Sequence, residues 1–122
     1  MSKTIAIVDD DDAVRDSLAV LLTTAGYHVQ VYETSAEFLR DAKQNRFDCV
    51  ILDNQMNGST GIDLAQKLAD KNVCISCVIM SGNMSDTEVK RARAAGITEI
   101  LEKPFTDETL IGTIEAQTSR LG

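Results

Sequence analysis

Residues 48–53 read Asp-Cys-Val-Ile-Leu-Asp, a run of four apolar residues between two carboxylates. A short apolar run without alternation is typical of a strand that is buried on both faces of a parallel sheet. Two further runs of this kind, Thr4–Asp9 and Val73–Ser81, stand before and after it along the chain. The three runs predict the central strands of one sheet, with Asp48–Asp53 in the middle.

Two weaker runs predict the edges of the same sheet. His28–Glu33 alternates, with Val29 and Val31 on one side and Gln30 on the other, as expected for a strand with one exposed face. Thr98–Lys103 is short and mixed in character, which suits the opposite edge.

Helical patterns separate the five runs. Apolar residues recur at helical spacing in Val14, Leu18, Leu21, Leu22 and Ala25, in Ile62, Ala65, Leu68 and Ala69, in Val89 and Ala92, and in Ile111, Ile114 and Leu121. Thr34 with Glu37, and Ser85 with Glu88, have the spacing of a capping box at the start of a helix. Gly26 is expected to end the first helix.

The alternation of strand and helix, five times over in 122 residues, predicts a single α/β domain over residues 1–122. Crossovers between parallel strands are right-handed, so the helices are expected on both faces of the sheet. With the two weaker strands at the edges, the strand order is 2-1-3-4-5. The expected fold is therefore a flavodoxin-like (βα)5 arrangement around a five-stranded parallel sheet.

Acidic side chains outnumber basic ones, 19 to 12, and the formal net charge is −7. A surface of this sign repels a phosphate backbone, so we expect no direct binding of nucleic acid. We find no segment that reads as a signal peptide or a membrane span, and we expect a cytoplasmic protein without a membrane partner. Three cysteines are present, and the Cys74–Cys77 pair lacks the further ligands of a zinc site.

Chemically active residue types stand at the carboxyl ends of the predicted strands, where ligands bind in sheets of this kind. The first strand runs into the acids Asp9–Asp12, and the third ends on Asp53. The fourth ends on Ser81-Gly82 and the fifth on Lys103-Pro104. Acids, a hydroxyl and an ammonium from four strands therefore converge on one edge, which predicts a functional site there.

The acids of the first and third strands predict a cation site. Asp9 and Asp10 are expected to face Asp53 across adjacent strands, and carboxylates held close repel one another unless a cation neutralises them. Mg²⁺ suits such a site because it takes oxygen ligands, keeps several waters and accepts a phosphate oxygen. Asp11 or Asp12 is interpreted instead as the N-cap of the first helix.

Asp53 also has the position of a nucleophile, because it ends a rigid buried strand. A carboxylate can attack phosphorus and form an aspartyl phosphate. Catalysis of phosphoryl transfer consists mostly of positioning and charge neutralisation, which Lys103 and the hydroxyl of Ser81 can supply. Gly82 leaves room for the incoming group.

Four motifs resemble the signature set of the CheY-like receiver domains of response regulators, over essentially the whole chain. They are Val8-Asp9-Asp10, Ile51-Leu52-Asp53-Asn54-Gln55-Met56, Met80-Ser81-Gly82 and Glu102-Lys103-Pro104-Phe105. Together with Ala13-Val14-Arg15-Asp16-Ser17-Leu18, the last motif is most similar to the FixJ-type branch.

The resemblance implies a two-component signalling protein whose Asp53 accepts a phosphoryl group from a histidine kinase or a histidine phosphotransfer protein. Asp10, Asp53 and the backbone carbonyl of Gln55 would bind Mg²⁺ directly, with Asp9 reaching it through water. Such a protein phosphorylates itself and has slow autophosphatase activity, and it is not an enzyme that turns over a substrate.

The resemblance also implies how the signal leaves the site. Ser81 would turn toward the phosphoryl group and Lys103 would pair with it, while Gln55 and Asn83 would tune how fast the group is lost. The Lys103–Pro104 bond would be cis. Output would run to a downstream protein partner through the face made by the fourth helix, the fifth strand and the fifth helix.

Two positions depart from the family pattern. Ile100 stands where receivers carry an aromatic switch residue, and a smaller aliphatic group can change its packing but offers no ring to swing toward the hydroxyl. Asn57 stands where a proline is usual, which predicts a looser loop after Asp53. Neither departure touches the phosphorylation chemistry.

Other functions remain open at this point. A pseudo-receiver would work through protein contacts without phosphorylation, although such domains typically lose the residues that are retained here. A Mg²⁺-dependent phosphohydrolase needs a second acid two residues after Asp53, where Gln55 stands, and a flavodoxin needs a Ser/Thr/Gly-rich phosphate loop after the first strand. His28 opens an edge strand away from the acids, so we do not expect it to be a phosphorelay histidine. If the chain is of natural length, it signals to a partner or acts as a phosphate shuttle or sink.

Overall fold

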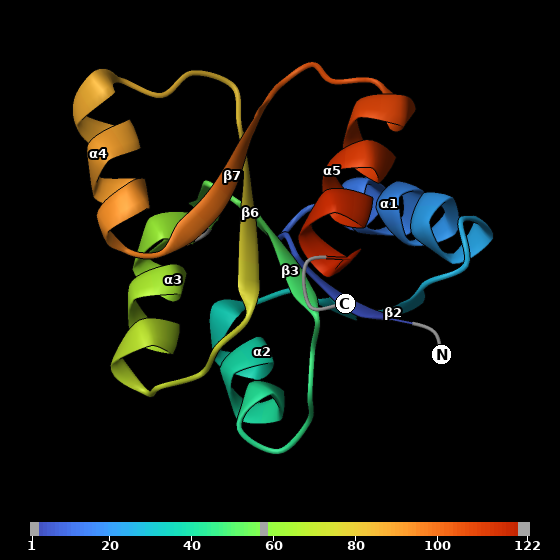
Figure 1. The fold of residues 1–122 in the computed structure, drawn as a ribbon, viewed down its shortest axis with the longest axis horizontal. Coiled ribbons are helices and arrows are strands. Elements are labelled where there is room, and N and C mark those ends of the chain that lie inside the picture. Colours follow the sequence, from blue (N-terminus) through green and yellow to red (C-terminus); the bar gives the residue numbers. More distant parts are fainter. Residues whose placement is uncertain (1–2, 57–58, 120–122) are drawn as a thin grey trace.

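The computed structural model describes residues 3–56 and 59–119. Twelve elements follow one another in this part of the chain (Figure 1). In order they are β1 (Thr4–Val8), α1 (Asp12–Thr24), β2 (His28–Tyr32), α2 (Ser35–Ala42), β3 (Cys49–Asp53), β4 (Gln55–Met56), β5 (Ser59–Thr60), α3 (Gly61–Asp70), β6 (Ser76–Ser81), α4 (Asp86–Ala94), β7 (Ile97–Glu102) and α5 (Asp107–Ser119).

Five strands form the main sheet in the order β2-β1-β3-β6-β7, and every neighbouring pair is parallel. The predicted order 2-1-3-4-5 is confirmed, with β6 and β7 as the fourth and fifth strands. A small antiparallel pair, β4 with β5, follows β3 and was not predicted. Strands of two residues are too short to show the alternation by which a strand is recognised in a sequence.

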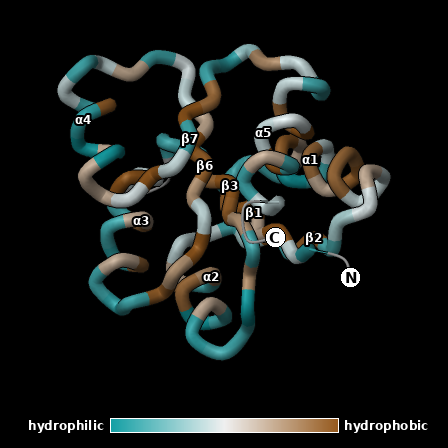
Figure 2. Tube along the Cα trace, viewed as in Figure 1, coloured by the Kyte–Doolittle hydropathy of each residue, from teal (hydrophilic) through white to brown (hydrophobic). Residues whose placement is uncertain are grey.

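Each face of the sheet carries its own hydrophobic core. One cluster packs α2, α3 and α4 against one face, with Phe38, Leu64 and Ala92 among its buried members. The other packs α1 and α5 against the opposite face, with Leu22 and Ile114 among its members. Figure 1 shows the helices on the two sides, and Figure 2 shows the hydrophobic residues concentrated in the central strands. Burial on both faces explains why the central strands are continuous apolar runs.

The helix ends follow the predicted caps. Asp11 is the N-cap of α1 and accepts hydrogen bonds from the first turn, and the Thr34–Glu37 and Ser85–Glu88 capping boxes are both formed. A third box, Thr60 with Asp63 at the start of α3, was not predicted. Gly26 follows α1 with φ +101°, a left-handed conformation that favours glycine and ends a helix, as expected.

The fourth predicted strand begins later than expected. Asn72 has φ 58°, its N–H donates to the carbonyl of Ala69, and Val73 N–H donates to the carbonyl of Leu68. These bonds form a Schellman cap on α3, so the run from Val73 first closes the helix and β6 begins only at Ser76.

Several apolar positions differ from the predicted stripes. Ala69 is exposed while Leu64 is buried, and Leu110 is buried in α5 although the predicted stripe there began at Ile111. Val31 is 45% exposed because β2 is an edge strand that is only partly covered. Leu121 lies outside the described residues. Among the helices that the structure describes, none is both long and apolar enough to cross a membrane.

Candidate functional site

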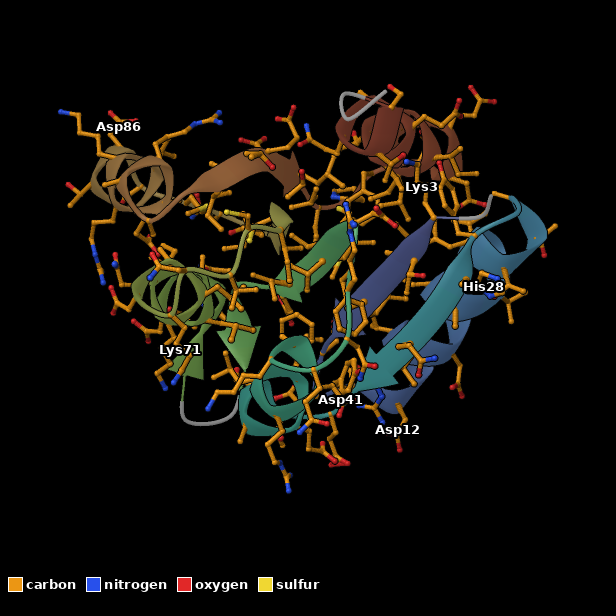
Figure 3. The ribbon with its side chains drawn as sticks, turned by 60° about the horizontal axis from the view of Figure 1, so that its bottom comes forward. Lys3, Asp12, His28, Asp41, Lys71 and Asp86 are labelled. Carbon is orange, nitrogen blue, oxygen red and sulfur yellow. The ribbon has the colours of Figure 1, made fainter. Side chains whose placement is uncertain are left out.

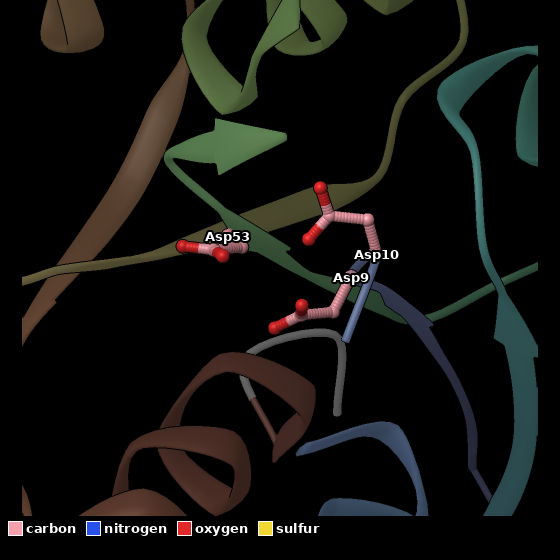
Figure 4. Close-up of side chains that lie close together, drawn as sticks. All are labelled: Asp9, Asp10 and Asp53. Carbon is pink, nitrogen blue, oxygen red and sulfur yellow. The ribbon is translucent and has the colours of Figure 1, made fainter. Parts of the chain in front are cut away.

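Asp9, Asp10 and Asp53 meet at the carboxyl ends of two neighbouring strands. Asp9 and Asp10 directly follow β1, and Asp53 is the last residue of its neighbour β3. One carboxylate oxygen of each lies within 4.8 Å of the others, and the three side chains lie close together (Figure 4). The sequence predicted this juxtaposition from the strand order alone.

Asp9 is the buried member of the cluster, with 1% of its surface exposed. Its N–H donates to the carbonyl of Tyr32 at 3.2 Å, and its Oδ1 accepts from the Asp11 N–H at 2.9 Å. Burial raises the pKa of the Asp9 carboxyl, and the charges of Asp53 and Asp10 raise it further, against the opposing effects of the Asp11 N–H and the Lys103 ammonium. The site therefore holds a carboxylate in surroundings that disfavour its charge.

A hard divalent cation fits this arrangement. The second oxygen of Asp9, Oδ2, is buried and has no hydrogen-bond partner among the described residues. A buried carboxylate oxygen without a donor is costly unless a cation or a cation-bound water satisfies it. Three carboxylates with few other protein ligands form the donor set that Mg²⁺ accepts.

Lys103 brings a positive charge to Asp53. Its Nζ lies 3.2 Å from Asp53 Oδ1, and the N–H of Gln55 donates to the same oxygen at 3.4 Å. The Asp53 side chain is 14% exposed and the Lys103 side chain 40%. The backbone of Lys103 is fixed by its N–H, which donates to the carbonyl of Ser81 at 2.8 Å, and the Lys103–Pro104 bond is cis, as expected.

A small polar cavity of about 330 Å³ opens beside the Asp53 carboxylate. It is lined by Asp53, Asn54, Gln55, Ser81, Gly82, Asn83 and Lys103. Ser81 is 5% exposed, and its Oγ accepts from the Asn83 N–H at 3.3 Å. A Cβ added at Gly82 would meet nothing within 4 Å, so the space beside this glycine is open. The cavity joins a carboxylate, a hydroxyl and an ammonium around one volume that can admit a phosphoryl group.

Two residues that support the site were missed in the sequence. A Cβ on Gly61 would lie 2.8 Å from Ile79 Cδ1 and 3.0 Å from the carbonyl oxygen of Asp53, so the start of α3 approaches the end of β3 too closely for a side chain. Asn54 is buried, and its N–H and carbonyl bond Met80 and Gly61.

The Asn54 side chain connects the loop after Asp53 to helix α4. It lies near Glu88 in the first turn of that helix and helps to lower the pKa of its carboxyl. The pKa of Glu88 is lowered mainly by the Ser85 N–H, then by the Ser85 hydroxyl, the Asn54 amide and the charge of Arg91, against the raising effect of desolvation. Asn54 stands inside the quoted motif Ile51–Met56, but its place there gives no sign of a neighbour on α4.

The remaining predicted positions lie around the site or away from it. Ile100 is half-buried and packs against the core on the α2–α3–α4 face. Asn57 lies outside the described residues. His28 begins β2, at the opposite end of that strand from Asp12 and the acids (Figure 3).

The cysteines take no part in the site. Cys74 was expected on a strand but lies before β6 and is exposed, while Cys49 and Cys77 are buried. Burial raises the pKa of both buried thiols to about 12, so both are protonated at neutral pH.

The chain resembles known proteins over nearly its whole length. Residues 5–115 match the response regulator receiver domain. The transcriptional regulatory protein FixJ of Rhizobium meliloti is 32% identical over 118 residues, which are 97% of this chain and 58% of that protein. The response regulator protein TmoT of Ectopseudomonas mendocina is 36% identical over 110 residues, which are 90% of this chain and 50% of that protein. The chain thus spans about half the length of these relatives.

A solved structure shows the same fold. The crystal structure of a CheY-like response regulator receiver domain protein from Methanospirillum hungatei superimposes with a TM-score of 0.92, at 25% identity, over 98% of this chain and 96% of that one. The matched family, the FixJ-type relatives and the shared fold agree with the acid cluster at the ends of β1 and β3. The chain belongs to the response regulator receiver domains of two-component signalling.

Proposed function

We propose that the chain is a phosphorylation switch in which Asp53 accepts a phosphoryl group from a histidine kinase or a histidine phosphotransfer protein. The observation that carries this proposal is the convergence at Asp53. One carboxylate meets two further acids, the ammonium of Lys103 at 3.2 Å and an open polar cavity. Receiver domains as a family interact with histidine kinases and downstream effectors, and they signal rather than turn over substrate.

Mg²⁺ is the cofactor that we assign to the acid cluster, in line with the acidic pocket where receiver domains generally bind it. Asp10, Asp53 and the carbonyl of Gln55 would hold the ion, and Asp9 would reach it through water. When bound, the ion neutralises negative charge on the phosphoryl oxygens. The orphaned Oδ2 of Asp9 supports this assignment, because a bound water or ion would give it a partner.

Asp53, Lys103 and Ser81 each have a separate part in the phosphoryl transfer. An Asp53 carboxylate oxygen forms a bond to phosphorus as the P–N bond of the phosphohistidine breaks, and the electron pair of that bond returns to the imidazole nitrogen. Among the described residues, Lys103 and the Gln55 N–H both contact Oδ1 of Asp53, which leaves Oδ2 as the oxygen placed to attack. Lys103 then pairs with a phosphoryl oxygen, and the hydroxyl of Ser81 turns from Asn83 to donate to another.

We infer that the signal leaves through α4, β7 and α5, to a protein partner or onward in a phosphate relay. Two connections to this face support the route. Asn54, directly after Asp53, lies near Glu88 at the start of α4, and Lys103 directly follows β7. Ile100 of β7 would adjust its packing in place of an aromatic ring. Gln55 and Asn83 line the cavity beside the phosphoryl group, where they would tune a slow autophosphatase reaction.

Intact-mass spectrometry after incubation with acetyl phosphate tests the proposal. One added phosphoryl group is expected in the presence of Mg²⁺ and none when Mg²⁺ is chelated. Asp53→Asn should add none, while Asp70→Asn, an exposed acid at the end of α3, should behave as wild type. No addition to the wild type, with no binding of beryllofluoride as a phosphoryl mimic, would instead indicate a pseudo-receiver.

A further inference from the structure

Arg15 of α1 reaches back to the acidic segment before its own helix. Its Nη1 donates to the carbonyl oxygen of Asp9 at 2.6 Å, and its Nη2 forms an ion pair with the carboxylate of Asp12. The Arg15 side chain is only 12% exposed, whereas that of Asp12 is 83% exposed. Of the two Arg15 contacts, the bond to the Asp9 carbonyl is therefore the one protected from solvent.

The position of Arg15 runs against the electrostatics of its helix. It is the fourth residue of α1, and the N-terminal end of a helix carries a partial positive charge that disfavours cations. A solvated arginine would extend away from that end. Instead the side chain folds back onto the acids, so its contacts with Asp9 and Asp12 account for where it lies.

The bond to Asp9 fixes a peptide plane at the acid cluster. The carbonyl of Asp9 and the N–H of Asp10 belong to one planar peptide unit, so the Arg15 hydrogen bond to that oxygen fixes the orientation of the backbone at Asp10. The other side of Asp9 is already held by the bond from its N–H to Tyr32. With both peptides fixed, the Asp10 carboxylate is directed toward Asp9 and Asp53.

We infer that Arg15 is a positioning residue for the cation site: it holds the Asp9–Asp10 peptide so that Asp10 can bind Mg²⁺ together with Asp53. This inference rests on the proposed function, because it assigns a residue to the same site. Arg15 acts through Asp9 and Asp10, and its guanidinium does not touch the ion.

The positive charge of Arg15 weakens Mg²⁺ binding, whereas its hydrogen bond to the Asp9 carbonyl strengthens that binding by positioning Asp10. A guanidinium near the site repels a cation, so if Arg15 acted by charge alone its removal would tighten Mg²⁺ binding. If it positions Asp10, its removal loosens the site and weakens binding. The sign of the change in Mg²⁺ affinity therefore separates the two roles.

Isothermal titration calorimetry with Mg²⁺ alone measures that sign. Arg15→Ala should raise the Mg²⁺ Kd by about tenfold, the range typical of residues that orient metal ligands. Arg15→Lys keeps the charge and one donor, and should recover part of the affinity. Arg93→Ala is the matched control, because Arg93 also donates to a backbone carbonyl, that of Thr98 at 3.3 Å, and its loss removes the same charge. It should leave the Kd unchanged.

The rate of phosphorylation by acetyl phosphate gives a second readout that a general loss of stability would not produce. Arg15→Ala should need more Mg²⁺ for its half-maximal rate and should reach the wild-type rate at saturating Mg²⁺. A Kd for Arg15→Ala that equals or falls below that of the wild type would overturn the inference and leave the proposed function intact. A wild-type chain that binds no Mg²⁺ would overturn both. If Arg15→Ala does not fold, an unchanged Kd in Arg15→Lys overturns the inference.

Discussion

The ammonium of Lys103 lies 3.2 Å from the carboxylate of Asp53, although 50 positions separate the two residues in the chain. Their strands are not neighbours, since β6 lies between β3 and β7. Lys103 therefore reaches across the end of β6, where its backbone N–H is held by the carbonyl of Ser81. The contact joins three strand ends at one point, and it places a cation where phosphoryl oxygens would carry negative charge.

Loss of this cation should affect chemistry more than stability. In Lys103→Met, the free energy of unfolding should change by less than about 1 kcal/mol, because a partly exposed ion pair contributes little. Phosphorylation by acetyl phosphate at saturating Mg²⁺ should slow by about tenfold or more, since one group that neutralises the phosphoryl oxygens is gone. Lys71→Met, at an exposed lysine after α3, is the control. An unchanged rate in Lys103→Met would show that Lys103 has no part in the reaction.

The buried carboxylate of Asp9 should make the Mg²⁺-free protein less stable at neutral pH. Its pKa is raised in the folded state, so the folded protein binds the proton more tightly than the unfolded chain does. The resulting stability is fully present below the unfolded pKa and is lost as the pH rises through the folded one. Asp9→Asn should therefore unfold at a higher temperature than the wild type at pH 7 without Mg²⁺, and the difference should shrink as the pH falls.

The same variant separates stability from cation binding. Mg²⁺ should raise the unfolding temperature of the wild type by more than that of Asp9→Asn, because the ion binds the folded state and relieves the carboxylates there. Equal shifts for the two proteins, measured by differential scanning calorimetry, would show that Asp9 takes no part in binding the cation.

Gly61 should be intolerant of even a methyl group. A Cβ would lie 2.8 Å from Ile79 Cδ1 and 3.0 Å from the carbonyl oxygen of Asp53, so Gly61→Ala must shift either the core or the end of β3. We expect a loss of about 1–3 kcal/mol in the free energy of unfolding, as for other overpacked sites, together with slower phosphorylation.

Gly112 supplies the control for this substitution. It lies within α5, and a Cβ there would meet nothing within 4 Å, so Gly112→Ala should stabilise the protein by about 1 kcal/mol through helix propensity. Urea unfolding of both variants tests the pair. Equal effects of the two substitutions would contradict the packing described at Gly61.

The sequence predicts the sheet and the acid cluster because both depend on pattern. Continuous apolar runs identify β1, β3 and β6, and the strand order then brings Asp9, Asp10 and Asp53 together. Which face of a helix is buried is harder to predict from the sequence. In α3 the predicted apolar stripe included Ala69, but Ala69 is exposed and Leu64 is buried instead.

Gly61, Asn54 and Arg15 act through contacts that have no pattern in the sequence. The need for glycine at position 61 comes from Ile79 on another strand, and the Asn54 side chain lies near Glu88 on another helix. Arg15 looks like an ordinary solvated residue of an amphipathic helix until its bond to the Asp9 carbonyl is seen. Such contacts arise only when the chain folds and brings distant segments together.

The central claim is that Asp53 is the phosphoacceptor, and the most direct measurement locates the phosphoryl group. Borohydride reduces an aspartyl phosphate to homoserine, which tandem mass spectrometry detects at a defined residue. After treatment with acetyl phosphate and Mg²⁺, followed by borohydride, homoserine is expected at position 53 and at no other aspartate. Homoserine at position 9 or 10, or a protein that gains a phosphoryl group without forming homoserine at position 53, would contradict the account.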